Sequence, residues 1–188
     1  MKNLFGASRH GAAMVGVLAA ASGVATAGGS LVGDTVEYWT HAQLNGQQQL
    51  REFGIVTDPG HEFTVDFFGT VWYTLDIGPN SLRLDTYEDW FSPWFNSGFP
   101  QTHLEIRDLD WSGAPGTTIV DVIVTYSSTG ITHEPGAPDD LPAFSAANVS
   151  FTADSVRIVV GGYAFAPGSW VNIEFVTVPG PGAAGGLG

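Results

Sequence analysis

The sequence predicts an all-β fold, an antiparallel, jelly-roll-like β-sandwich of roughly eight to ten strands. Three observations lead to this prediction. Apolar and polar residues alternate along short segments rich in β-branched and aromatic residues, as in strands with one buried face. Turns that contain proline and glycine separate these segments. No window after residue 27 has a clear helical period.

The predicted strands follow one another along the chain. The first three lie in DTVEYWTHAQL, REFGIVT and HEFTVDFFG. The segments VWYTLDIG and LRLDTY are predicted to form a hairpin, because a Gly-Pro-Asn-Ser turn joins them. The later strands are predicted in HLEIRDLDW, TIVDVIVTYSS, VSFTADSVRIVVGG and SWVNIEFVTV. Residues 88–102 and 130–143 are predicted to be loops.

The first 27 residues have the layout of a signal peptide. Lys2 and Arg9 make a basic start, a run of small and apolar residues follows, and a small-x-small cleavage site ends at Ala27. The run is too short and too rich in glycine and alanine for a membrane span, although an uncleaved N-terminal anchor is the alternative. The sequence thus predicts a signal peptide (1–27), a β-sandwich domain (28–178) and a Pro/Gly/Ala-rich tail (179–188).

The charge limits the partners of the mature chain. After the signal peptide, the chain has four arginines and 19 acidic residues, so its net charge is −15. Such a surface repels nucleic acid and anionic lipid, so neither is an expected partner. It is compatible with metal ions, with neutral sugars or simply with solubility. The chain has no cysteine, which excludes disulfides, zinc–thiolate sites and a thiol nucleophile.

No catalytic motif is present. The chain lacks the Gly-x-Ser-x-Gly elbow, the phosphate-binding loop, the dinucleotide fingerprint and His-Glu-x-x-His. The histidines after the signal peptide are scattered in sequence and are predicted to be solvated or on strand surfaces: His41, His61, His103 and His133. A non-enzymatic protein is therefore the first hypothesis. The alternative is a secreted glycan-active hydrolase that uses a pair of carboxylates, which the sequence does not identify.

Asp108 and Asp110 are the candidate metal ligands. They lie two residues apart on a predicted strand, so their side chains are expected on one face. Carboxylate oxygens suit Ca²⁺, and a calcium-stabilised structural domain is a further alternative function. The competing interpretation is that both side chains simply face solvent.

An aromatic loop is the candidate ligand-binding segment. Trp90, Trp94 and Phe95 fall within residues 88–102, which also contain proline and glycine. Exposed aromatic rings can stack on the apolar face of a sugar, so this loop is a candidate glycan contact. The alternative is that its aromatic side chains pack into the end of the sandwich core, because a large exposed apolar patch is unfavourable.

The end of the chain resembles a bacterial sorting tail. Val178-Pro179-Gly180-Pro181 is similar to the Val-Pro-Glu-Pro motif of the PEP-CTERM class, and GAAGGLG is similar to the start of its apolar segment. The stretches DIGPNSLRLD, RDLDW and VSFTADSVRIVVGGYAFAPGSWVNIEF resemble ectodomains that carry such tails. The resemblance implies an exported β-rich protein at the cell surface or in the extracellular matrix of a bacterium. It also implies adhesion or contact with polysaccharide or envelope components, and it supplies no catalytic residue.

The tail departs from that class in two ways. Gly180 stands in place of the usual glutamate, between Pro179 and Pro181, and neither the apolar helix nor the arginine cluster follows. A membrane span needs about 20 apolar residues, many more than follow Pro181. The sequence predicts no membrane span beyond the signal peptide. It leaves two interpretations open, a truncated anchor or a released protein.

Overall fold

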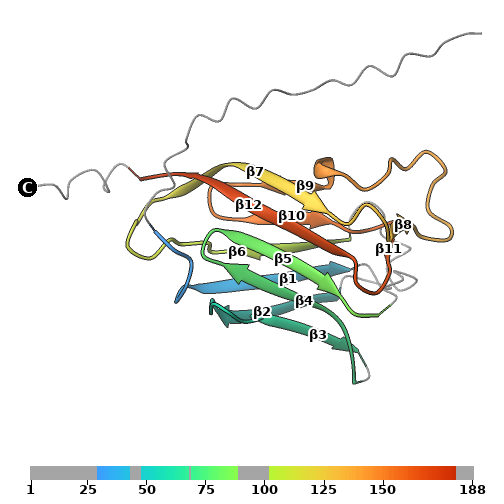
Figure 1. Ribbon diagram of the computed structural model, residues 1–188, viewed down its shortest axis with the longest axis horizontal. Helices are drawn as coiled ribbons and strands as arrows, with labels where there is room; N and C mark the ends of the chain where they lie inside the picture. Colours follow the sequence, from blue (N-terminus) through green and yellow to red (C-terminus); the bar gives the residue numbers. More distant parts are fainter. Residues whose placement is uncertain (1–28, 43–47, 68, 89–101, 181–188) are drawn as a thin grey trace, which may run out of the picture.

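The computed structural model describes residues 29–42, 48–67, 69–88 and 102–180. Within these residues, twelve strands form two five-stranded antiparallel sheets and one two-stranded sheet (Figure 1). The predicted antiparallel β-sandwich is confirmed. The strands outnumber the eight to ten expected because several of them are only three or four residues long. No helix in the described ranges is both long enough and apolar enough to cross a membrane.

The first sheet joins strands from distant parts of the chain. Its order is β2 (Gln48–Ile55), β1 (Thr35–Ala42), β6 (His103–Arg107), β10 (Val156–Val159) and β9 (Val149–Phe151). A short 3₁₀ turn, η2 (Ala146–Asn148), leads into β9, and Ser145 caps it through its side chain. The strand β1 pairs with its sequence neighbour β2 on one side and with β6 on the other. Residues far apart in the chain therefore become direct neighbours on this sheet.

The second sheet contains the predicted hairpin. Its order is β3 (Phe63–Phe67), β4 (Thr70–Gly78), β5 (Ser81–Thr86), β12 (Trp170–Val178) and β7 (Thr118–Tyr126). The hairpin of β4 and β5 is confirmed, with its turn at Pro79 and Asn80. The Asn80 side chain donates to the Phe175 carbonyl at 2.6 Å and accepts from Trp111 Nε1 at 3.2 Å, which ties the turn to the core.

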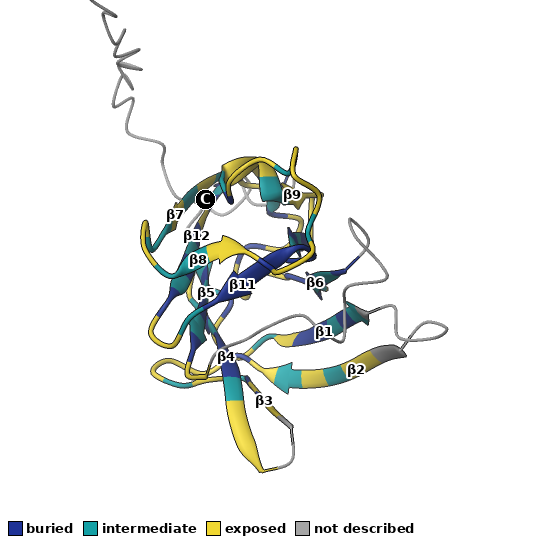
Figure 2. Ribbon diagram, turned by 90° about the vertical axis from the view of Figure 1, so that its right-hand side faces the viewer, coloured by how far each residue is buried: buried dark blue, intermediate teal, exposed yellow. Residues whose placement is uncertain are grey.

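The two large sheets lie face to face and enclose the core. Figure 1 shows the second sheet lying over the first, with the strands of the two sheets nearly aligned. The short sheet of β8 (Ile131–His133) and β11 (Tyr163–Phe165) lies at one end (Figure 2). Along β5, Leu82 and Leu84 are buried while Arg83 between them is half-exposed. This alternation, predicted from the sequence, puts one face of each sheet in a single apolar core.

A group of hydroxyls connects the two sheets inside this core. The Tyr38 hydroxyl on β1 hydrogen-bonds to the Tyr73 hydroxyl on β4 and to Thr40 Oγ1. All three residues are buried, and burial raises the pKa of Tyr73 to about 12, so the phenols stay neutral. The Tyr38 ring also packs on Phe63, with ring centroids 5.1 Å apart. The sheets are therefore joined by a specific polar contact as well as by apolar packing.

The chain leaves the sandwich at the end of β12. Pro179 is exposed after Val178, and Gly180 is buried against the loop before β7. A Cβ atom at Gly180 would lie 2.6 Å from the backbone carbonyl of Gly116, closer than real Cβ atoms approach. Any side chain at position 180 would therefore require this segment to move away from Gly116.

The hydroxyl group between the sheets makes a testable contribution to stability. Tyr38→Phe should lower the free energy of unfolding by about 1–3 kcal/mol, because it removes hydrogen-bond partners from the buried Tyr73 and Thr40 hydroxyls. The double variant Tyr38→Phe/Tyr73→Phe should lose less than the sum of the two single variants. Urea unfolding measures both effects. Tyr87→Phe, at a residue with 49% exposure, is the control, and additive losses would contradict a direct contact.

Candidate functional site

Most of the ion pairs between described residues lie on the outer face of the first sheet. Along β1 and β6 every second residue faces the core, and these residues are buried: Val36, Tyr38, Leu104 and Ile106. The residues between them face outward: Glu37, Trp39, His41, His103, Glu105 and Arg107. The alternation that buries one set therefore presents the other set together on one surface.

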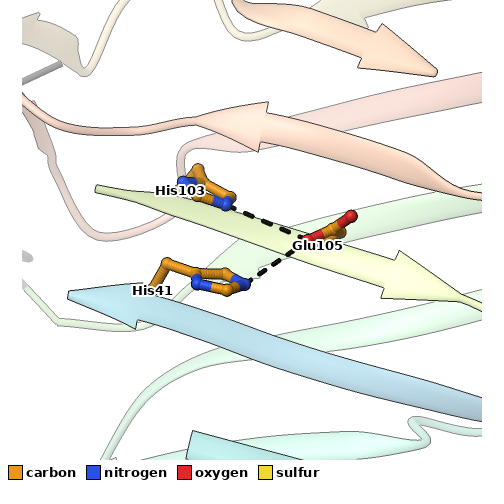
Figure 3. Close-up of side chains that lie close together, drawn as sticks. All are labelled: His41, His103 and Glu105. Carbon is orange, nitrogen blue, oxygen red and sulfur yellow. Dashed lines mark ion pairs between the residues drawn. The ribbon is translucent and has the colours of Figure 1, made fainter. Parts of the chain in front are cut away.

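The register between β1 and β6 brings two histidines and a glutamate into contact. His41 lies directly opposite His103, and Trp39 lies opposite Glu105. The two imidazole rings stack with centroids 4.2 Å apart and an interplanar angle of 14°. Figure 3 shows both rings directed at the same carboxylate, with Glu105 Oε2 3.4 Å from His41 Nε2 and 3.9 Å from His103 Nε2.

Glu105 is held in its ionised form. Burial raises its pKa, but the hydrogen bond and the charge of Arg107 lower it, as do the two histidines, and the net pKa lies below the ordinary value. Arg107 Nη2 donates to Glu105 Oε2 at 2.8 Å. An acid with a lowered pKa is a poor proton donor at neutral pH, so Glu105 does not suit the general-acid role of a glycosidase.

His41 is held in its neutral form. Burial is the largest cause that lowers its pKa, and the charges of Arg107 and Arg157 lower it further, while Glu105 opposes them. Its Nε2 atom is shielded from solvent and makes no hydrogen bond within the described part of the chain. The neutral imidazole therefore holds its Nε2 atom 3.4 Å from the Glu105 carboxylate without a well-aligned hydrogen bond.

Arginines and aromatic rings surround this group, and we call Trp39, Arg51, Phe53 and Arg107 the Arg–aromatic face. The Arg51 guanidinium lies 5.1 Å from the Trp39 ring centroid and 4.8 Å from that of Phe53. The Arg107 guanidinium lies 5.0 Å from the Trp39 centroid. Arg51 also pairs with the buried Glu37. Phe53 is 61% exposed, so this face ends in an apolar ring open to solvent.

Asp108 and Asp110, the predicted metal ligands, lie just beyond this sheet. The strand β6 ends at Arg107, so both residues follow it in a loop, and the prediction that they share a strand face is wrong. Both are exposed, and Asp34 Oδ2 accepts the Asp110 backbone N–H at 2.8 Å. Burial, together with the charges of Asp110 and Asp108, keeps the pKa of Asp34 above its ordinary value. Calcium binding by Asp108 and Asp110 stays a prediction.

Most of the other predicted site residues lie outside the described residues. This holds for the aromatic loop residues Trp90, Trp94 and Phe95, for the cleavage site at Ala27 and for Pro181 of the tail. Their roles stay predictions. Pro179 is described and is exposed, immediately after β12.

A depression on the outer side of the second sheet does not supply the carboxylate pair of a hydrolase. Its volume is about 570 Å³, and it lies beside the β4–β5 turn. The residues that line it are Pro79, Asn80, Ser81, Ile123, Asn172, Glu174, Phe175, Val176 and Thr177. Glu174 is the single ionisable side chain among the described residues that line it. A pair of acids would need a second carboxylate at this place.

Sequence reasoning missed the group of His41, His103 and Glu105. The sequence predicts these histidines to be solvated or on strand surfaces; His41 and His103 do lie on paired strands, but their side chains are largely shielded and stack on each other. The spacing His103-x-Glu105 on a strand was the available signal, because residues two apart share a face. The chain matches no protein-family model, no curated protein and no solved structure.

The lowered pKa of His41 predicts a pH effect on stability. The unfolded chain takes up the His41 proton near its ordinary pKa of 6.5, and the folded chain does so only at lower pH. As the pH falls below 6.5, the wild type should therefore lose stability relative to His41→Asn, by at most about 1.4 kcal/mol per pH unit. The difference should stay constant above pH 7.

Urea unfolding at a series of pH values, in chelator-treated buffer, measures this effect. The side chains that face His41 from the paired strands are His103, Glu105, Arg107 and Arg157, and all four are kept in the variant. Parallel stability curves for the wild type and His41→Asn between pH 4 and 8 would contradict the prediction.

Proposed function

We propose that the protein is an exported, non-enzymatic β-sandwich of a bacterial envelope or extracellular matrix, and that it works by contact with polysaccharide. The signal-peptide layout and the resemblance of the tail to sorting tails support export. The Arg–aromatic face supports the contact. The single observation that carries the proposal is the exposed Phe53 ring with the Arg51 guanidinium stacked over it on an open sheet face.

The chemistry of this face suits sugars. An exposed aromatic ring offers its face to the apolar side of a pyranose. The neighbouring guanidinium groups donate several hydrogen bonds in a fixed plane, which suits hydroxyl and carboxylate groups of a polysaccharide. These side chains stand on hydrogen-bonded strands of a packed sheet, so their backbone positions are fixed before a ligand binds.

The distribution of charge also favours this face. Three of the four arginines that follow the signal peptide, Arg51, Arg107 and Arg157, face outward from the first sheet. Two glutamates, Glu37 and Glu105, face outward among them. This face is therefore slightly basic in a chain that is strongly acidic overall, so a sugar with acidic groups would meet less repulsion here than elsewhere.

The loop with Trp90 and Trp94 is the second candidate surface. It lies outside the described residues, so the sequence is its only support. The same experiment tests both surfaces, because their aromatic residues can be replaced independently.

A glycan array tests the proposal. We expect the wild type to bind at least one class of bacterial polysaccharide, and Phe53→Ala and Arg51→Ala each to weaken binding at least about fivefold, the effect of roughly 1 kcal/mol. Trp90→Ala and Trp94→Ala test the loop in parallel. Titration calorimetry with the best array ligand gives the affinities.

The second sheet offers matched controls. Arg83 stacks 5.0 Å from the Trp170 centroid and pairs with Asp85, so Arg83→Ala removes a similar cation–π contact elsewhere. Ile123→Ala removes an apolar side chain with 53% exposure on β7. Neither control should change binding. No binding by the wild type, or equal losses in variants and controls, would overturn the proposal.

A further inference from the structure

We propose that His41, His103 and Glu105 form a binding site for a divalent transition-metal ion, and Zn²⁺ is the ion we expect. Each of the three side chains offers one ligand atom, and all three atoms lie within 4.8 Å of one another. This proposal goes beyond polysaccharide contact and does not depend on it. It rests on the geometry of the three side chains, their shielding and the chemistry of their donor atoms.

The spacing of the donor atoms suits a metal ion. In a tetrahedral zinc site with bonds of about 2.0–2.1 Å, ligand atoms lie about 3.3–3.4 Å apart. The distance from His41 Nε2 to Glu105 Oε2 is 3.4 Å, and that from His103 Nε2 to the same oxygen is 3.9 Å. All three ligand atoms lie within 4.8 Å of one another, so the stacked rings must rotate to bring both imidazole nitrogens and the carboxylate oxygen around one ion. Three protein ligands leave one position for water or an anionic ligand group.

The shielding of the group also favours an ion. The side chains of His41, His103 and Glu105 are 20%, 12% and 17% exposed. The buried Nε2 of His41 lies 3.4 Å from Glu105 Oε2 but makes no well-aligned hydrogen bond within the described residues. A buried nitrogen without a partner is destabilising, and a metal ion that accepts its lone pair would satisfy it.

The donor set distinguishes this site from a calcium site. Two imidazole nitrogens and one carboxylate oxygen suit zinc and other first-row transition metals, whereas Ca²⁺ takes oxygen ligands. Arg107 hydrogen-bonds to Glu105 Oε2 at 2.8 Å and holds that carboxylate in place from outside the ligand group. The positive charges of Arg107 and Arg157 lower the affinity for a cation, so we expect micromolar rather than nanomolar binding.

Isothermal titration of the chelator-treated protein with Zn²⁺ tests the site. We expect one equivalent to bind to the wild type. The single variants His41→Asn, His103→Asn and Glu105→Gln should each weaken binding at least about 100-fold, since removing a ligand exceeds the 10–100-fold effect of removing its outer partner. His133→Asn is the matched control, because His133 is an exposed strand histidine whose Nε2 lies 3.2 Å from the Pro142 carbonyl oxygen. The control should bind as the wild type does.

A second measurement needs no variant and therefore avoids any effect on folding. In long-range ¹H–¹⁵N spectra of the wild type, Zn²⁺ should shift the ring nitrogens of His41 and His103 to metal-bound positions and leave those of His133 in place. Sub-stoichiometric binding, unchanged affinity in the three variants, or the absence of these two shifts would overturn the proposal. Because glycan binding is measured separately, the failure of either proposal can be recognised by itself.

Discussion

The antiparallel pairing of β1 with β6 is the contact on which the site depends. In its observed register, Tyr38 and Ile106 face the core while His41 and His103 meet on the outer face. A shift of one residue would turn one strand over relative to the other and expose its apolar side chains. The burial of the inner face therefore fixes which side chains meet on the outer face. The positions of His41, His103 and Glu105 are well defined because the core beneath them is packed.

The core performs this role without covalent cross-links. The chain has no cysteine, so the two sheets are held by apolar side chains and by the hydroxyl contact between Tyr38 and Tyr73. Apolar packing is insensitive to direction, whereas a buried hydrogen bond between two sheets requires one relative placement. The combination gives the outer face of the first sheet a rigid support.

Charge works differently at long and short range in this protein. The acidic surface repels anions from a distance, but salt screens exposed charges over about 8–10 Å. At contact distance the charge of the first sheet's outer face is set by its arginines, and Arg51 and Arg107 are each paired with a glutamate. The guanidinium groups also lie over the aromatic rings, that of Arg51 over Trp39 and Phe53 and that of Arg107 over Trp39. The guanidinium groups of this face are thus held in place by short-range contacts.

Local patterns in the sequence determined the fold class and the hairpin of β4 and β5. Alternation and turn residues act between near neighbours, so they can be recognised without the structure. The same reasoning placed Asp108 on a strand that in fact ends at Arg107, because a strand end depends on what its partner strand offers. Only the tertiary structure brought His41 to His103. Four other described strands, β2 to β5, lie between theirs in the chain, and the packing of the whole sandwich decides which strands pair.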